Sequence, residues 1–230
     1  MNANIYAMVI DFVCVMCMYR FVKNDNILCK IGYVIVALFN FFVLYLTGSR
    51  TALLPFVLIF PIFLYCVRWK KLFITSIVLE LCVCGLVFLK PTLIPRISDM
   101  STFASRIKIW KTAFMCISMY PLFGWGPQTY KKFYPLVHGH KAPHAHNIYI
   151  DSILSYGVVG TILVLAYTFV LNKEIFTSNT RKENPALFGM MMCFIAIVLI
   201  YGLLDRTLNI VATGTLCFII LNSACMYLEK

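Results

Sequence analysis

The chain has 230 residues and a net charge of +11, with 61% hydrophobic and only 13% charged residues. Soluble domains are about half apolar and about 25% charged, so this composition excludes an ordinary soluble enzyme. It predicts an integral membrane protein, for which the bilayer is the solvent. The sequence contains no module that interleaves basic and aromatic residues for nucleic acid. Its positive charge therefore favours anionic lipid headgroups, or an anionic lipid-linked substrate, as partners.

Seven segments are long and apolar enough to cross a membrane, because a spanning helix needs about 20 mainly apolar residues. They cover roughly residues 3–19, 31–47, 51–67, 72–89, 148–171, 186–204 and 207–228. The first segment has no basic stretch before it and no small-residue cleavage site after it, so we expect a retained helix. The sequence therefore predicts one all-α, polytopic membrane domain over residues 1–230, with a long loop at 90–147.

Lysine and arginine residues predict the orientation, because short cytoplasmic loops are enriched in them. They follow the first, third and fifth spans: Arg20, Lys23 and Lys30, then Arg68, Lys70 and Lys71, then Lys173, Arg181 and Lys182. The amino terminus, the turn at 47–50 and the 90–147 loop are then extracytoplasmic. This loop is also basic, but long loops follow the rule weakly. Its charge fits either anionic headgroups or an anionic substrate.

The turn Thr47-Gly48-Ser49-Arg50-Thr51 joins two apolar spans at the predicted outer surface. An arginine there can act as an interfacial anchor, with its charged end in the headgroup region. Alternatively, the Arg50 guanidinium can hold a phosphate through its planar fork of donors. The backbone amides of Gly48 and Ser49 would then add further donors. Both interpretations are open at this point.

The 90–147 loop contains a predicted helix over residues 102–120, which we expect to lie on the membrane surface. Arg106, Trp110 and Ala113 share one face of it at helical spacing. Pro121 ends the helix, because the residue before a proline avoids the α region. Arg106 is either a solvated charge on this helix or, if it turns inward, a second ligand for the anion at Arg50.

All four histidines lie within nine residues, at His138, His140, His144 and His146. Three interpretations compete: a metal site, a solvated cluster and a general base. The spacing lacks the cysteine or carboxylate partners of a closed structural zinc site. A general base is favoured, because histidine exchanges protons near neutral pH. It points to His146, with His144 assisting.

The residues after His146 support this choice. His146 and Asn147 stand at the start of the 148–171 helix, and Gly157 and Gly160 are expected to let another helix pack closely against it. Asp151, one turn into that helix, either orients His146 or has no role at the site, and both interpretations are open. Asp11 and Glu80 lie within spans, where ionisable groups are functional hypotheses by default. Their roles are left open.

Together these motifs resemble the O-antigen ligase and O-antigen polymerase superfamily. The matching residues are Thr47-Gly48-Ser49-Arg50, Ser105-Arg106-x3-Trp110, Pro121-x2-Gly124-x-Gly126 and His146-Asn147-x9-Gly157-x2-Gly160, within roughly residues 30–215. The resemblance implies an all-helical, GT-C-like membrane fold. Members are usually longer and have more spans, so the chain resembles the carboxy-terminal half of one.

The resemblance also implies a reaction in the bacterial cytoplasmic (inner) membrane. Members take a glycan from an undecaprenyl-pyrophosphate carrier on the periplasmic face and pass it to lipid A core or to a second lipid-linked glycan. The implied enzyme is a metal-independent, inverting glycosyltransferase without a cofactor. Arg50 and Arg106 would hold the pyrophosphate, and His146 would activate the acceptor hydroxyl. Further substrate contacts are expected from Trp110, Tyr130, His144 and Asn147.

Two alternatives belong to other classes. A transporter or flippase for a lipid-linked or anionic solute would use polar groups at mid-membrane, where Asp11 and Glu80 lie. An inactive, truncated family member would fit the short chain.

Overall fold

The structure is a computed structural model that describes residues 3–93, 101–176, 178–207 and 211–228. The described part is helical and contains no strand. Its long helices are α1 (Ala3–Lys23), α2 (Ile27–Thr47), α3 (Arg50–Cys66), α4 (Lys70–Leu89), α5 (Ser101–Met119), α7 (Ile148–Asn172), α9 (Pro185–Leu204) and α10 (Val211–Leu228). Short helical turns are η1 (Pro91–Leu93), α6 (Thr129–Phe133), η2 (Lys173–Phe176) and α8 (Ser178–Glu183). The predicted all-α, polytopic fold is confirmed.

Each of the seven predicted spans overlaps one helix, and residues 208–210 of the last span lie outside the described residues. Within the described residues, five helices are long and apolar enough to cross a membrane: α1, α2, α4, α7 and α9. Helix α3 is a shorter apolar helix. The predicted surface helix at 102–120 is α5, which ends at Met119, two residues before Pro121. Helix α6, one turn long, was not predicted.

The main core lies where α1, α3 and α9 pack together. Its fully buried side chains include Phe12 of α1, Phe63 of α3 and Phe194 of α9. The rings of Phe12 and Phe194 meet edge to face, with centroids 5.1 Å apart. Helix α9 approaches α3 closely at Gly189, where an added Cβ would lie 3.1 Å from Cys66 Cβ. Small residues permit such close approach between membrane helices.

We expect Gly189→Leu to destabilise the bundle, because the added side chain must push α9 away from α3. Overpacking of this kind typically costs about 1–3 kcal/mol. Thermal unfolding of the purified protein in detergent should show a clearly lower Tm. Gly85→Leu on α4 is the matched control, since nothing lies within 4 Å of an added Cβ there. Equal Tm values for the two variants would contradict this account of the α3–α9 contact.

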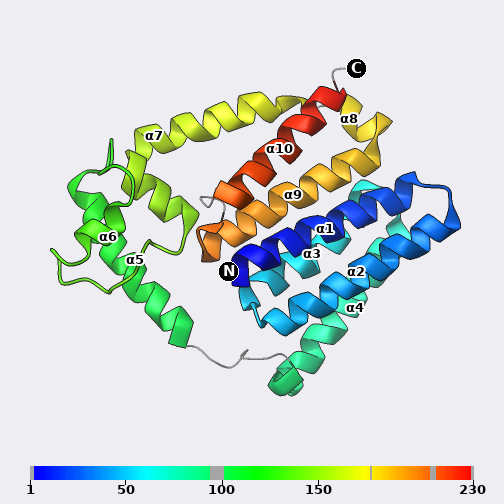
Figure 1. Cartoon of the computed structure of the whole chain (residues 1–230), viewed down its shortest axis with the longest axis horizontal. Coiled ribbons are helices and arrows are strands. Elements are labelled where there is room, and N and C mark those ends of the chain that lie inside the picture. Colours follow the sequence, from blue (N-terminus) through cyan, green and yellow to red (C-terminus); the bar gives the residue numbers. More distant parts are fainter. Residues whose placement is uncertain (1–2, 94–100, 177, 208–210, 229–230) are drawn as a thin grey trace.

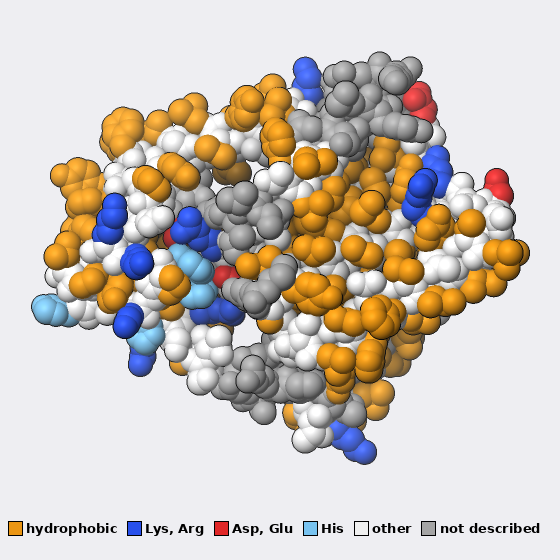
Figure 2. Space-filling view, viewed as in Figure 1, with side chains coloured by type: hydrophobic (Ala, Val, Ile, Leu, Met, Phe, Trp, Pro, Cys, Tyr) orange, Lys and Arg blue, Asp and Glu red, His pale blue; other side chains and the backbone are white. Residues whose placement is uncertain are grey.

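Helices α2 and α4 expose nearly all of their apolar side chains. Leu44 is the one buried side chain of α2 among the described residues, and the described part of α4 buries none. Figure 2 shows hydrophobic side chains spread over the bundle, while Lys, Arg and His side chains gather over the α5–α6 region. Exposed apolar faces of this size suit a lipid environment rather than water.

The two ends of the bundle carry different features (Figure 1). One end holds the α1–α2 link and α8, whose Arg181 guanidinium lies 5.9 Å from the ring centre of Tyr65. The other end holds the start of α1, the α2–α3 turn and the α9–α10 link. Beside this second end, α5, α6 and the loop to α7 pack around a smaller core that includes Ile109, Tyr130 and Leu154.

Candidate active site

His146 lies at the bundle end formed by the α2–α3 turn and the α9–α10 link. Its Nδ1 atom is 3.3 Å from Oδ1 of Asp205, the residue that ends α9. The side chain of His146 is 29% exposed and that of Asp205 only 5%, so the imidazole is accessible while its partner is buried. His146 has φ +48°, a left-handed conformation that is uncommon outside glycine. Such strain is often found at functional sites.

The charge state of Asp205 determines the tautomer of His146. Burial alone would raise the pKa of Asp205, but hydrogen bonds from His146, Asn4 and the Arg206 amide outweigh it and lower the pKa to about 2. Asp205 is therefore a carboxylate at neutral pH and can only accept. The proton of a neutral His146 must then sit on Nδ1, and Nε2 carries the lone pair. This arrangement prepares Nε2 to act as a base.

A chain of hydrogen bonds joins this pair to the α2–α3 turn. The Asn4 amide nitrogen donates to Asp205 Oδ2. The Ser49 hydroxyl donates to Asn4 Oδ1 at 2.7 Å. Ser49 immediately precedes Arg50, the first residue of α3. The chain therefore couples the position of His146 to the turn that carries Arg50.

The structure decides between the two interpretations of Asp151, because its carboxylate does not contact His146. Asp151 contacts Arg206, with Arg206 Nε 3.0 Å from Asp151 Oδ2, and it accepts from the Ala145 amide at 3.2 Å. Asp205, not Asp151, bonds the imidazole of His146. Asp151 therefore connects the histidine loop, through Ala145, to the α9–α10 link, through Arg206.

His144 lies beside His146, with ring centres 4.2 Å apart. The His146 amide donates to His144 Nδ1 at 3.2 Å. Burial, and then the neighbouring His146, lower the pKa of His144. A lowered pKa favours neutral His144, whose unprotonated Nδ1 can accept from the His146 amide and so help to position His146. His138 is exposed on the same loop.

Other predicted site residues support the loop that carries His146. Trp110 on α5 donates its indole N–H to the Ala145 carbonyl at 3.0 Å. Asn147 caps α7 by accepting from the Tyr149 and Ile150 amides, and its Nδ2 donates to the Leu203 carbonyl at 3.0 Å. The buried Tyr130 donates its hydroxyl to the His140 carbonyl at 2.7 Å. Substrate contacts for these three residues stay predictions.

The two predicted anion ligands are placed by their helices. Arg106 is half-buried on α5, one turn before Trp110, and so stands near the histidine loop. The backbone of Arg50 begins α3, while its side chain lies outside the described residues. The amides of Gly48 and Ser49 are already engaged, donating to the Tyr45 carbonyl and the Thr47 hydroxyl at 3.2 Å each. Their predicted role as further anion donors is therefore wrong.

Helix α7 is broken at Gly157, which has φ +69° and ψ −178°. In an unbroken helix, the amides of Val158 and Val159 would bond to the carbonyls of Leu154 and Ser155. Here the segment after α5 inserts and satisfies all four groups. The bonds run from Val158 N–H to Pro121 O (2.9 Å), Val159 N–H to Leu122 O (3.1 Å), Trp125 N–H to Leu154 O (3.0 Å) and Gly126 N–H to Ser155 O (2.9 Å).

This junction corrects the predicted role of the α7 glycines. An added Cβ on Gly157 would lie 2.1 Å from the Leu122 carbonyl oxygen, and one on Gly124 would lie 2.5 Å from the Gly157 nitrogen. The close neighbour is therefore the loop after α5 rather than a packed helix. Gly160 meets only Tyr156 of its own helix. The close approach to α7 comes instead from Gly202 of α9, where a Cβ would lie 2.5 Å from Ile148 Cγ2.

We expect Gly157→Ala to disrupt this junction, because the methyl group collides with backbone and the residue must keep a positive φ. The expected loss of stability is about 2–4 kcal/mol, the range for backbone strain combined with lost buried hydrogen bonds. Hydrogen exchange of the Val158 and Val159 amides should become faster. Gly32→Ala is the control, since an added Cβ there meets nothing within 4 Å. Unchanged protection in Gly157→Ala would contradict the described junction.

The donor set could also hold a metal ion. His144, His146 and Asp205 each offer one ligand atom, and these atoms lie within 4.8 Å of one another. Two histidines and a carboxylate suit an open zinc site. His146 and Asp205 already bond to each other, so an ion bound through those two atoms would replace that hydrogen bond.

A model of the O-antigen ligase family matches residues 35–165, which is more than half of the 230 residues. The chain belongs to the O-antigen ligase family. No curated protein matched the sequence. Family membership supports a general role in glycan transfer, as a ligase or a polymerase. It also fits a multi-pass membrane protein. The matched range contains Ser49, Arg50, Arg106 and His146 and excludes Asn4 and Asp205.

Sequence reasoning missed Asn4, Asp205 and Arg206 as members of the site, and for Ser49 it missed the hydroxyl contact with Asn4. A signal for two of them was present, because Asp205-Arg206 is a charged pair between two apolar spans, in a link predicted to face the same side as the histidine loop. Asn4 gave no comparable signal, since a single amide near a helix start is common. Only the tertiary structure joins it to Asp205.

Proposed function

We propose that this protein transfers a glycan from an undecaprenyl-pyrophosphate carrier to an acceptor sugar hydroxyl at the outer face of the bacterial cytoplasmic membrane. The observation that carries the proposal is the hydrogen-bond chain from His146 through Asp205 and Asn4 to Ser49. It holds an oriented base close to the turn that carries Arg50. Family membership supports glycan transfer in general, and the charge pattern of the short links supports a periplasmic 90–147 loop.

The reaction breaks the bond between the anomeric carbon and the pyrophosphate oxygen and forms a bond from that carbon to the acceptor oxygen. His146 Nε2 takes the acceptor hydroxyl proton as the acceptor attacks, a contribution of about 10²–10⁴-fold in rate. Arg50 and Arg106 stabilise the negative charge that develops on the departing pyrophosphate. Asp205 stabilises the imidazolium that forms. Direct displacement of this kind inverts the anomeric centre and needs no metal.

The acceptor is lipid A core for a ligase and a second lipid-linked glycan for a polymerase. The acceptor would lie against the region around the histidine loop, which includes Trp110, Tyr130, His144 and Asn147. A transporter or flippase is disfavoured, because the linked polar side chains gather at one end of the bundle. In a transporter the substrate site lies near mid-membrane. Asp11 and Glu80 lie away from that end, and Asp11 Oδ2 accepts from the Tyr201 hydroxyl at 3.0 Å.

A deletion strain tests the proposal and separates the two reactions. We expect loss of polymeric glycan on the cell surface, read as a ladder on a gel. Absence of all glycan on lipid A identifies a ligase, and caps of one repeating unit identify a polymerase. Donor lipid trapped on the cytoplasmic side would instead support a flippase and contradict the proposal. An intact ladder in the deletion strain would also contradict it.

A further inference from the structure

The side chains of His144, His146 and Asp205 have nearly the spacing that a zinc ion requires. A tetrahedral zinc ion with bonds of about 2.0–2.1 Å needs ligand atoms roughly 3.4 Å apart. His146 Nδ1 and Asp205 Oδ1 already stand 3.3 Å apart. The ligand atoms of all three residues lie within 4.8 Å of one another, so His144 has to move by roughly 1.5 Å to complete the set.

The group is accessible at its imidazoles and anchored at its carboxylate. The side chain of His146 is 29% exposed and His144 is half-buried, whereas the side chain of Asp205 is only 5% exposed. A hydrated ion can therefore reach the rings from outside and meet the carboxylate behind them. Asp205 is held by the Asn4 side chain and the Arg206 amide, and outer bonds of this kind orient a metal ligand.

The charge around the group also permits a cation. The guanidinium of Arg206 is the positive group beside it, and Arg206 Nε lies 3.0 Å from Asp151 Oδ2. This ion pair compensates the arginine charge, so the Asp205 carboxylate is left to balance a bound ion. Three protein ligands would leave the fourth position to water, as in open zinc sites.

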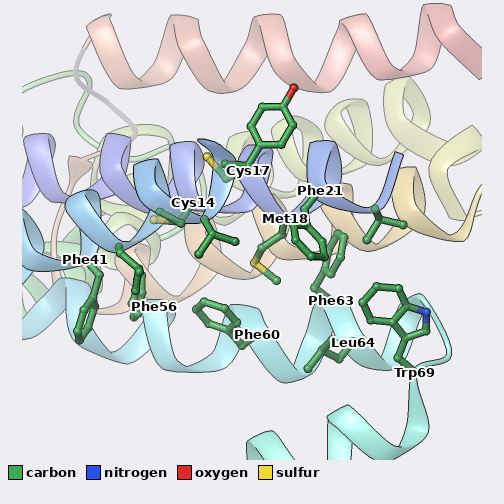
Figure 3. A pocket seen from close by; sticks show the side chains of 15 residues that line it. Cys14, Cys17, Met18, Phe21, Phe41, Phe56, Phe60, Phe63, Leu64 and Trp69 are labelled. Carbon is green, nitrogen blue, oxygen red and sulfur yellow. The ribbon is translucent and has the colours of Figure 1, made fainter. Parts of the chain in front are cut away.

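Cysteines are the other strong zinc ligands in proteins, and Cys14 and Cys17 have the spacing of a paired site. Both are buried and line an apolar groove between α1, α2 and α3, which has aromatic walls and no charged lining residue (Figure 3). A divalent ion there would lose its water with only these two thiols to replace it, which is costly. The histidine group is therefore the better zinc site.

We propose that His144, His146 and Asp205 bind a zinc ion that inhibits the enzyme. The inhibition rests on the proposed function, whereas the binding does not. Zinc bonded to His146 Nδ1 takes the place of the proton there, and that proton moves to Nε2. The imidazole stays neutral but loses the lone pair that would accept the acceptor hydroxyl proton. Transfer thus needs no metal and is blocked by one.

Zinc binding to the purified full chain, measured by competition with a chromophoric chelator, tests the site. Accessible thiols such as Cys29 are first blocked with N-ethylmaleimide. His144→Ala should weaken zinc binding at least about 10–100-fold, because even residues that only support a metal ligand contribute that much. The double variant His138→Ala/His140→Ala is the matched control. It removes two histidines of the same loop that do not belong to the three-residue group, and should bind zinc like the wild type.

Asp205→Asn provides a second variant if His144→Ala does not fold, because a neutral amide is a weaker zinc ligand than a carboxylate. We expect a similar weakening. Equal zinc binding by the wild type and a folded variant of the group would overturn the inference. Loss of binding in the His138→Ala/His140→Ala control would also overturn it, since the loop would then act as a non-specific chelator.

The inhibition is measured on the wild-type enzyme. Saturating zinc should lower the rate of glycan transfer to about that of His146→Ala, because both remove the base, and EDTA should restore it. Magnesium, which prefers oxygen ligands, should have no effect at the same concentration. Full activity of the zinc-saturated enzyme would contradict the inhibition.

Failure of the zinc site and failure of the proposed function give different results. If the variants change zinc binding as expected while the deletion strain keeps its surface glycan, the proposed function fails and the zinc site stands. If the deletion strain loses its glycan while all variants bind zinc equally, only the zinc site fails.

Discussion

Replacing His146 with alanine should lower glycan transfer about 10²–10⁴-fold, the usual contribution of a general base. The reason is the geometry at Nδ1, where the bond to the Asp205 carboxylate leaves Nε2 as the acceptor for the hydroxyl proton. In the deletion strain, a plasmid that encodes His146→Ala should fail to restore the surface glycan ladder. The protein level should stay normal, because His146 is partly exposed and lies outside both hydrophobic cores.

His138→Ala is the matched control, because His138 lies on the same loop and is exposed. We expect it to restore the ladder fully. Arg106→Ala should resemble His146→Ala if Arg106 holds the pyrophosphate. A wild-type ladder from His146→Ala, at normal protein level, would contradict the role of His146 as the base.

Replacing Asp205 with asparagine should lower transfer roughly 10²-fold or more, by analogy with the amide variant of a Ser-His-Asp triad. An amide can turn its NH₂ group toward Nδ1, which moves the imidazole proton to Nε2 and removes the lone pair needed for the base. The change is nearly isosteric, and the remaining carbonyl oxygen still accepts from Asn4. The Arg206 amide, which donates to the same oxygen as His146 Nδ1, then loses its acceptor, so some loss of stability accompanies the loss of rate. Initial rates of the purified enzyme, together with its Tm, distinguish this effect from unfolding.

Two further variants make the comparison specific. Asp25→Asn, in the exposed α1–α2 link, should leave the rate unchanged. Asp151→Asn weakens the contact with Arg206 and should lower Tm more than it lowers the rate. If Asp151→Asn proved more damaging to the rate than Asp205→Asn, then Asp151 would be the residue that orients His146, against the observed geometry.

Most of the helical architecture could be predicted, because long apolar runs in a membrane protein have few alternatives to helices. The predicted spans agree with the observed helices to within a few residues at most ends. Pro121 marked the end of α5, whereas α1 continues past the predicted end at residue 19 to Lys23. The helix break at Gly157 could not be predicted, since it depends on a segment about thirty residues earlier that supplies the missing hydrogen bonds.

The candidate site could be predicted only in part. His146 stood out because it adjoins Asn147 at a helix start, and that position is as expected. Its partner Asp205 lies 59 positions away, and nothing in local spacing connects the two. Nearness in sequence favoured Asp151, but the direction of the α7 helix turns that carboxylate toward Arg206 instead. Pairings between distant residues are settled by packing rather than by local sequence.

The central claim is that this chain transfers glycan from a polyprenyl-pyrophosphate donor with His146 as the base. The most direct test reconstitutes the purified protein in liposomes with an undecaprenyl-pyrophosphate-linked glycan and an acceptor glycolipid, and follows product formation and anomeric configuration by NMR. The account predicts product of inverted configuration from the wild type, without added metal, and almost none from His146→Ala. Equal rates for both proteins, or a product of retained configuration, would contradict it.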